Sequence, residues 1–162
     1  MNTAMSEVRK VEVDDLTPLG QLWIDGWHEA HDAISSPELM RLRTDQSFHD
    51  RMASFGDQIR CTGPVGAPTG LCVVQDDELH QLFTSPAVRG AGVAQALIAD
   101  AEERVRVAGY EKIWLDVAIG NDRARRFYEK MGWWMRGEEI VELVTQEGPL
   151  PTKLWVFEKV VS

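Results

Sequence analysis

The spacing of apolar residues along the chain predicts alternating strands and helices. Between residues 18 and 31 apolar side chains recur every three or four positions, and the preceding Thr17-Pro18 pair is a typical helix start. Ser36-Pro37 repeats this start and predicts a second helix. Short runs of alternating or β-branched residues predict strands. The predicted strands cover 7–13, 57–62, 70–75, 78–85, 112–119, about 133–143 and 152–161, and the predicted helices cover 18–31, 37 to about 54, about 93–109 and 121–132.

This order of elements predicts an α/β fold. Consecutive strands are joined by turns and form hairpins, whereas other strands are joined through helices, so the sheet should be mixed and covered by helices on both faces. No linker marks a boundary, and 162 residues with 44% hydrophobic content suit one domain spanning 1–162.

Composition narrows the function classes. The net charge of −9 argues against a protein that binds nucleic acid over its whole surface. The sequence lacks a run of about 20 apolar residues and an apolar stretch near its start, so we expect neither a membrane helix nor a secretory signal. Two cysteines suit the reducing cytoplasm. A symmetric hairpin would place Cys61 opposite Cys72, but we do not expect a disulfide there.

The strongest local signal is a glycine-rich turn between a predicted strand and a predicted helix. It reads Arg89-Gly90-Ala91-Gly92-Val93-Ala94. Glycines let a backbone approach a ligand closely, and the first N–H groups of a helix attract anions such as pyrophosphate. Arg89 would add a fixed cation. The spacing fits neither a P-loop nor a dinucleotide-binding Rossmann turn, and a purely structural turn is the alternative.

Charge placement favours the binding interpretation. Eight basic and seven acidic residues lie from Pro86 to Lys130, a net charge of +1, so the remainder of the chain carries −10. By electrostatic steering, that acidic remainder would favour a cationic substrate.

A second signal starts at the predicted helix after residue 120. Asn121 stands where an N-cap belongs, and its amide could also bond a ligand. Tyr128 follows two turns later and could reach a cleft shared with the preceding strand.

Together these two blocks resemble the motifs of the GNAT acetyltransferase superfamily. The run from Leu82 to Ala94 resembles its acetyl-CoA motif, Arg/Gln-x-x-Gly-x-Gly/Ala, and Asn121-x-x-Ala124-x-x-Phe127-Tyr128 with Gly132-Trp133 is similar to its second motif. Thr84 stands where an aliphatic residue is usual, and Trp133 stands in place of Phe. The resemblance covers 78–133 and implies a GNAT-like fold, with a mixed sheet of six or seven strands and about four helices.

The resemblance also implies roles for individual residues. The backbone of Phe83 and Thr84, with Leu82 beside them, would pair with the pantetheine arm of acetyl-CoA. The turn would hold the pyrophosphate through Arg89, Gly90, Ala91, Gly92, Val93 and Ala94. Asn121 would bond the pantetheine near Ala124 and Phe127, and Tyr128 would lie near the thioester sulfur.

Direct transfer to an amine requires a base and an acid. Glu78 and His80 lie two residues apart on one predicted strand, so they share a face and either could take the amine proton. A solvated or salt-bridged pair is the alternative. Tyr128 would protonate the departing sulfur.

Other residue groups carry weaker signals. Trp23 and Trp27 could line the acceptor pocket or form a core stripe. His28 and His31 are three residues apart and lack an evident third ligand, so we expect no metal site. No nucleophile motif is present.

The sequence thus predicts a cytoplasmic N-acetyltransferase. Its cosubstrate would be acetyl-CoA without a metal, and its acceptor a primary amine of a small molecule or peptide, with no nucleic-acid or membrane partner. A strand edge near the C-terminus could pair two subunits as a homodimer. The alternatives are a module that binds acyl-CoA without turnover, transfer to oxygen, and transfer of a longer acyl group.

Overall fold

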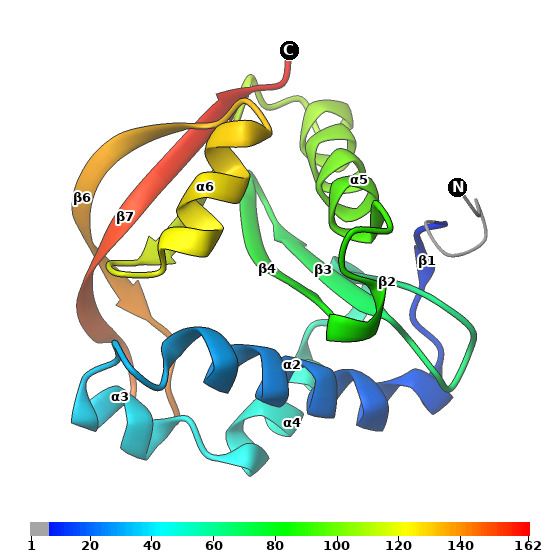
Figure 1. Ribbon diagram of the computed structural model, residues 1–162, viewed down its shortest axis with the longest axis horizontal. Helices are drawn as coiled ribbons and strands as arrows, with labels where there is room; N and C mark the ends of the chain where they lie inside the picture. The colour runs from blue at the N-terminus through cyan, green and yellow to red at the C-terminus, as the bar shows by residue number, and fades with distance from the viewer. Residues whose placement is uncertain (1–6) are drawn as a thin grey trace.

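A computed structural model describes residues 7–162 as a seven-stranded sheet flanked by helices (Figure 1). The strand order is β1-β2-β3-β4-β5-β7-β6, and all neighbours are antiparallel except β4 and β5. This confirms the predicted α/β fold with a mixed sheet. Residues 1–6 lie outside the described residues. The expectation that the chain lacks a secretory signal concerns this segment.

The predicted elements are present with shifted ends. The strands are β1 Arg9–Lys10, β2 Ile59–Thr62, β3 Gly70–Gln75, β4 Glu78–Thr84, β5 Lys112–Ala118, β6 Trp134–Leu143 and β7 Leu150–Val160. The α-helices are α2 Leu16–His31, α3 Pro37–Leu42, α4 Asp45–Ser54, α5 Val93–Val107 and α6 Asp122–Lys130, with short 3-10 turns η1 Val13–Asp15, η2 Gly56–Gln58 and η3 Pro86–Val88.

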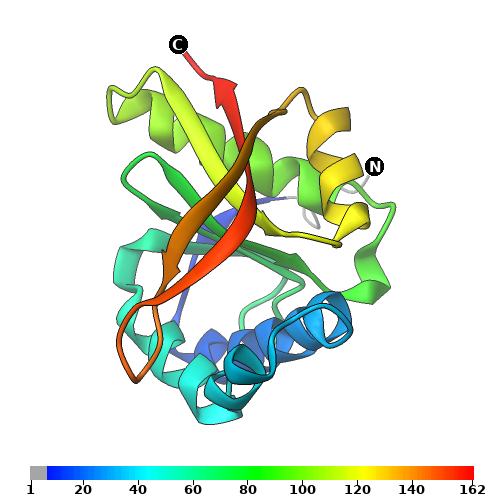
Figure 2. The same ribbon diagram turned by 90° about the vertical axis from the view of Figure 1, so that its left-hand side faces the viewer.

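Helices cover both faces of the sheet (Figure 2). Apolar residues of α2, α3 and α4 form one core with alternate residues of β2 and β3, whereas α5 and α6 pack over the opposite face with β5 and β7. In β3 the alternation is direct, because Leu71 and Val73 enter the first core and Cys72 enters the second.

The register of the β2–β3 hairpin corrects the expectation that the two cysteines face each other. Cys61 pairs with Leu71, and Cys72 pairs with Arg60. The hairpin is therefore one residue away from the symmetric register, and a shift of one residue turns a side chain to the other face. Both thiols are free and buried in different cores, which excludes a bond between them in this register.

Two other predictions were wrong in extent. The single helix predicted from 37 to about 54 is broken at Arg43, where the backbone leaves helical geometry, and the Thr44 side chain caps α4 by accepting from the N–H of Ser47. The strand predicted over 7–13 shrinks to Arg9–Lys10, because the Asp15 carboxylate binds the Arg9 guanidinium at 2.8 Å and the Glu12 N–H at 2.8 Å and thereby folds the chain into η1.

The parallel contact between β4 and β5 positions the site. Within residues 7–162 the two strands share one register pair, Glu78 with Trp114. Beyond this pair β4 continues along β3 and β5 continues along β7. Strand β4 has a bulge at His80 near this divergence. Val73 of β3 pairs with Gln81 and Val74 pairs with Leu79, so His80 between them has no register partner on β3. The facing edges of β4 and β5 are therefore left without a strand partner.

Candidate functional site

A cleft with a volume of about 1210 Å³ lies where β4 and β5 diverge. Its walls come from β4, β5, the glycine-rich turn, the start of α6 and one side of α2. All the site residues predicted from the sequence line this cleft except Glu78. Glu78 lines a smaller cavity of about 170 Å³, which shares Arg43, Arg51, His80 and Asp116 with the cleft.

The glycine-rich turn forms one end of the cleft. Gly90 and Gly92 both adopt left-handed backbone angles, with φ of 81° and 82°. Gly92 is the N-cap of α5, and no side chain within residues 7–162 caps this helix, so the N–H groups of its first turn are available to a ligand. A side chain would disfavour these backbone angles, which explains the glycines. The geometry is that of an anion site at a helix N-terminus.

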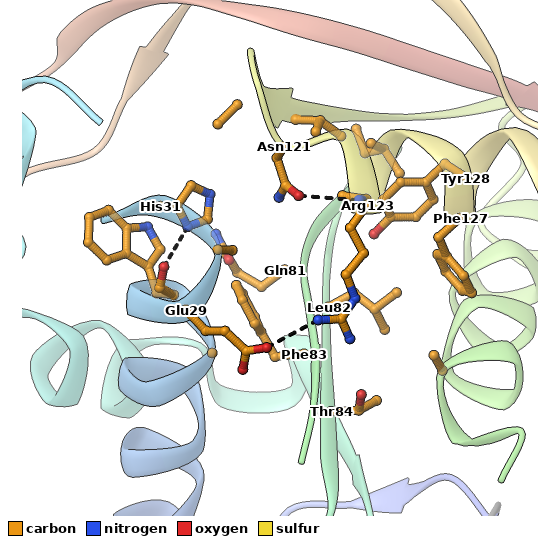
Figure 3. A pocket seen from close by; sticks show the side chains of 18 of the residues that line it. Glu29, His31, Gln81, Leu82, Phe83, Thr84, Asn121, Arg123, Phe127 and Tyr128 are labelled. Atoms are coloured by element: carbon orange, nitrogen blue, oxygen red, sulfur yellow. Dashed lines mark hydrogen bonds and ion pairs between the residues drawn. The ribbon is translucent and has the colours of Figure 1, made fainter. Parts of the chain in front are cut away.

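Glu29 of α2 holds two arginines beside this turn. Its carboxylate accepts from Arg89 at 2.7 Å and from Arg123 at 3.1 Å, and Figure 3 shows the contact with Arg123. These contacts, the Arg89 hydrogen bond foremost, lower the pKa of Glu29 below its usual value. In the sequence Glu29 lies between His28 and His31 without a signal of its own, so its contacts were not predicted.

The β4 wall consists of Leu82, Phe83 and Thr84, all partly buried. Helix α2 packs tightly against this β4 wall. A Cβ added at Gly26 of α2 would lie only 2.6 Å from the Phe83 ring. Only a residue without a side chain permits this approach. The close packing fixes the α2 wall of the cleft.

Asn121 and Tyr128 form the α6 wall (Figure 3). As the sequence predicted, Asn121 caps α6, and its Oδ1 accepts from the N–H of Ala124 at 3.2 Å. The Tyr128 ring is 9% exposed and packs against Phe127 and Trp133, with its hydroxyl turned toward the cavity. Burial raises the pKa of Tyr128 well above its usual value, so the phenol is protonated at neutral pH.

An acidic cluster lies where β4 and β5 meet. The Nδ1 of His80 is 3.4 Å from the Glu78 carboxylate, so the predicted pair is in contact. Asp116 of β5 belongs to the same cluster, and burial, aided by the charge of Glu78, raises its pKa to about 6. Sequence reasoning missed Asp116. The available signal was a carboxylate inside β5, whose other residues after Lys112 are all apolar.

Comparison with known proteins identifies the family of this chain. A model of the acetyltransferase (GNAT) family matches residues 23–133. The chain belongs to the GNAT family. This confirms the resemblance drawn from residues 78–133.

Sequence relatives of this GNAT chain match it over part of their length. An uncharacterised N-acetyltransferase from Mycobacterium bovis is 35% identical over 69 residues, which cover 43% of this chain and 44% of the relative. An uncharacterised N-acetyltransferase from Methanocaldococcus jannaschii is 36% identical over 56 residues, covering 35% of this chain and 25% of the relative. The match thus spans less than half the length of either relative.

Solved structures of other GNAT proteins share the fold over nearly the whole chain. A GCN5-related N-acetyltransferase from Rhodopseudomonas palustris has a TM-score of 0.72 at 17% identity, with 96% of each chain covered. The PaiA N-acetyltransferase from Thermoplasma acidophilum, solved in complex with coenzyme A, has a TM-score of 0.65 at 18% identity, with 95% of this chain and 98% of that chain covered.

This GNAT cleft also contains two arginines that the sequence analysis did not single out. Arg43, at the break between α3 and α4, is 6% exposed and donates to the carbonyl of Val144. The Arg51 guanidinium lies 4.6 Å from the centre of the Trp23 ring and 3.4 Å from Nε2 of His80. No local signal marks either residue, because arginines are common on helix surfaces.

The aromatic and histidine residues of α2 have mainly structural contacts in this GNAT fold. Trp23 and Trp27 line the cleft but are buried in the core below it. His31 contacts the carbonyl of Trp27 at 2.8 Å, and His28 contacts Asp32 at 2.6 Å. Among residues 7–162 no group of three possible metal ligands is present, and no helix is long and apolar enough to cross a bilayer.

Proposed function

We propose that this chain transfers an acetyl group from acetyl-CoA directly to a primary amine. The observation that carries the proposal is the divergence of β4 from β5, which opens a cleft between an uncapped helix N-terminus and a cluster of acid–base side chains. A ligand that is anionic at one end and reactive at the other fits this arrangement. The coenzyme A bound to the Thermoplasma acidophilum protein of the same fold supports the choice of ligand.

The cleft residues fit acetyl-CoA by chemistry. The turn from Arg89 to Ala94 would hold the pyrophosphate through the N–H groups at the start of α5. Leu82, Phe83 and Thr84 would present the unpaired β4 backbone to the amides of the pantetheine arm, and Asn121 would bond the same arm from α6. Ala124 and Phe127 would supply apolar contacts from the α6 wall. When bound, acetyl-CoA supplies an acetyl group activated as a thioester.

The acidic cluster would accept the amine proton. An ammonium group must lose one proton before its nitrogen can attack the thioester carbon, and a second proton must leave the nitrogen as the carbon–sulfur bond breaks. With a pKa of about 6, the Asp116 carboxylate is ionised at neutral pH and basic enough to accept this proton. Glu78 and His80 lie in the same cluster and would pass the proton toward solvent. We therefore assign the base function to this cluster, with Asp116 as its principal member.

Tyr128 would donate its phenol proton to the departing sulfur, and the resulting phenolate would take a proton back from solvent in the cleft before the next turnover. Its phenol is protonated at neutral pH and lines the cleft. A covalent enzyme intermediate has no support, because burial raises the pKa of Cys61 to about 11 and of Cys72 to about 12 and keeps both thiols protonated. Transfer would thus occur directly within a complex of both substrates.

The test combines binding and turnover. CoA binding is measured by calorimetry, and thiol release from acetyl-CoA is measured over a panel of primary amines. We expect Tyr128→Phe to lower kcat about 100-fold or more and to leave the Kd for CoA nearly unchanged, because the ring is retained. CoA binding without turnover on any amine would contradict the proposal and favour a non-catalytic acyl-CoA-binding module. No heat with CoA would contradict both.

Partners and compartment follow the same reasoning. We infer that the acceptor is a small molecule or peptide amine, and that the two buried free thiols suit a reducing, cytoplasmic setting. Strand β6 ends the sheet and exposes Trp134 and Ile140, which supports the proposal of a homodimer through this edge.

A further inference from the structure

The cleft of this protein contains two pairs of arginines that differ in their counter-ions. Arg89 and Arg123, at the end near the glycine-rich turn, both bind the Glu29 carboxylate. Arg43 and Arg51, at the opposite end, bind no carboxylate among residues 7–162. The fold therefore supplies an ion-paired carboxylate at one end, whereas at the other end no described carboxylate lies within ion-pair distance of the two arginines.

The missing anion has an energetic consequence. Arg43 is nearly fully buried, Arg51 is partly buried, and burial lowers the pKa of both side chains. Burial also lowers the pKa of His31, and the charge of Arg43 lowers the pKa of both His31 and Arg51 further, which places all three within electrostatic reach of one another. Gathering cations away from water without a counter-ion is unfavourable, and a bound anion would relieve that cost.

The cavity of about 170 Å³ that Arg43 and Arg51 line is also lined by carboxylates. Asp116 and Glu78 lie on the sheet with His80 beside them, and Glu142 of β6 lines the cavity as well. Arg51 lies 3.4 Å from Nε2 of His80, so the arginines adjoin this acidic cluster without an ion pair to it. That volume is below the several hundred Å³ typical of sites for drug-sized ligands. The cavity thus suits a small group with a positive or proton-donating end toward the sheet and a negative end toward the helices.

We propose that the acceptor is an amino acid or a closely related small amine, whose carboxylate is bound by Arg43 and Arg51 while its amine faces Asp116. The proposal rests on the proposed acetyltransferase function and specifies its substrate class. It differs from the cationic acceptor that the charge of −10 outside residues 86–130 would favour, because the charges lining the cavity are closer to the acceptor than the distant surface.

The first experiment compares acceptors that differ only in the carboxylate. Thiol release from acetyl-CoA is measured with the common amino acids and with their carboxamides. We expect the preferred amino acid to exceed its amide in kcat/KM by about 30-fold or more, as charge-assisted hydrogen bonds to a carboxylate imply. Arg43→Gln and Arg51→Gln should each remove most of that preference and leave the KM for acetyl-CoA unchanged.

Control variants separate recognition from folding. Arg41→Gln removes an exposed arginine of α3 that pairs with Glu147, and it should leave the preference for the acid intact. Because Arg51 stacks on Trp23, its loss could destabilise the core, so Arg51→Lys is measured as well. The lysine variant keeps the charge and should retain part of the preference. Equal losses for the acid and the amide in every Arg43 and Arg51 variant would indicate a structural role and overturn the proposal.

Binding measurements keep this inference separable from the transferase function. Calorimetry with CoA present compares N-acetyl amino acids with N-acetyl amino-acid amides. Turnover on amides equal to that on acids overturns the carboxylate site and leaves the transferase standing. No turnover on any amine, with arginine-dependent binding of the N-acetyl acids, overturns the transferase and leaves the carboxylate site standing. Loss of both signals overturns both.

A last comparison tests the acyl donor as the source of the carboxylate. Succinyl-CoA and acetyl-CoA are offered with the same neutral amine. Preference for acetyl-CoA, unchanged by Arg51→Gln, is the expected result. An Arg51-dependent preference for succinyl-CoA would place the carboxylate on the donor and overturn the proposal.

Discussion

Replacing Asp116 by asparagine should stabilise the protein and inactivate it. Burial raises the pKa of this carboxyl from 3.8 to about 6, which corresponds to about 3 kcal/mol of preference for its neutral form in the folded protein. Above pH 6 the folded protein contains a buried carboxylate and is destabilised relative to a variant that cannot ionise. Asparagine retains the size and polarity of the side chain without the charge.

The pH dependence of this effect has a definite sign. Below pH 3.8 the carboxyl is neutral in both the folded and the unfolded chain, so ionisation changes nothing. Between pH 3.8 and 6 the unfolded chain ionises first, and the stability of the native protein relative to Asp116→Asn falls as pH rises. The difference in unfolding free energy should grow by about 2 kcal/mol between pH 4.5 and 7.5, and it should then stay constant.

Urea unfolding across this pH range measures the difference. Asp57→Asn, which removes an exposed carboxylate in η2, is the matched control and should show no such trend. A difference between native and Asp116→Asn that does not vary with pH would refute the argument from burial.

Activity supplies an independent measurement of the same residue. The kcat/KM of the native enzyme should fall as pH drops through about 6, because the carboxyl is then protonated and cannot accept the amine proton. Asp116→Asn should lose this dependence and about 100-fold or more in rate at pH 8. Retention of the acidic limb in the variant would show that another group is the base.

Three further predictions concern the turn, its neighbouring carboxylate and the thiols. Gly90→Ala should cost about 1 kcal/mol of stability and weaken CoA binding roughly tenfold. The cause is backbone strain alone, since φ is 81° and a Cβ there would meet no described atom within 4 Å. Urea unfolding measures the stability and calorimetry measures the binding, and unchanged binding would contradict the role of the turn. Glu29→Gln frees its two arginines for phosphate and should raise CoA affinity up to about fivefold at low salt, with the gain shrinking at high salt; weaker binding at low salt would count against this. Cys61 and Cys72 should resist a thiol reagent in the native protein and react on unfolding, because both are buried and protonated; rapid native labelling would contradict that burial.

Local sequence patterns were sufficient for most of the fold. Helical spacing located α2 and α5, and Asn121 marked the start of α6 because an N-cap depends only on its own side chain and the next three residues. The turn around Gly92 was visible for the same reason, since left-handed backbone angles are a local requirement. The motif resemblance then located the cleft-lining residues on β4 and α6.

Local sequence patterns did not predict the register of the β2–β3 hairpin or the division of the second predicted helix into α3 and α4. Cys61 and Cys72 lie on opposite faces of the sheet because Cys61 pairs with Leu71 in the observed register, which buries apolar residues in two separate cores. A shift by one residue leaves the sequence pattern of each strand unchanged. At the break between α3 and α4, the Arg43 side chain donates to the carbonyl of Val144, about a hundred positions away, and local spacing gives no sign of this contact.

The local sequence determined which segments form helices, strands and the glycine-rich turn, because those properties depend on neighbours a few residues apart. The tertiary structure alone decided which side chains meet at the end of the cleft where β4 and β5 pair. Arg43, Arg51, His80 and Asp116 come from separate elements and share one small cavity. Their charges and the raised pKa of Asp116 arise from burial, which the chain acquires only when distant segments pack together.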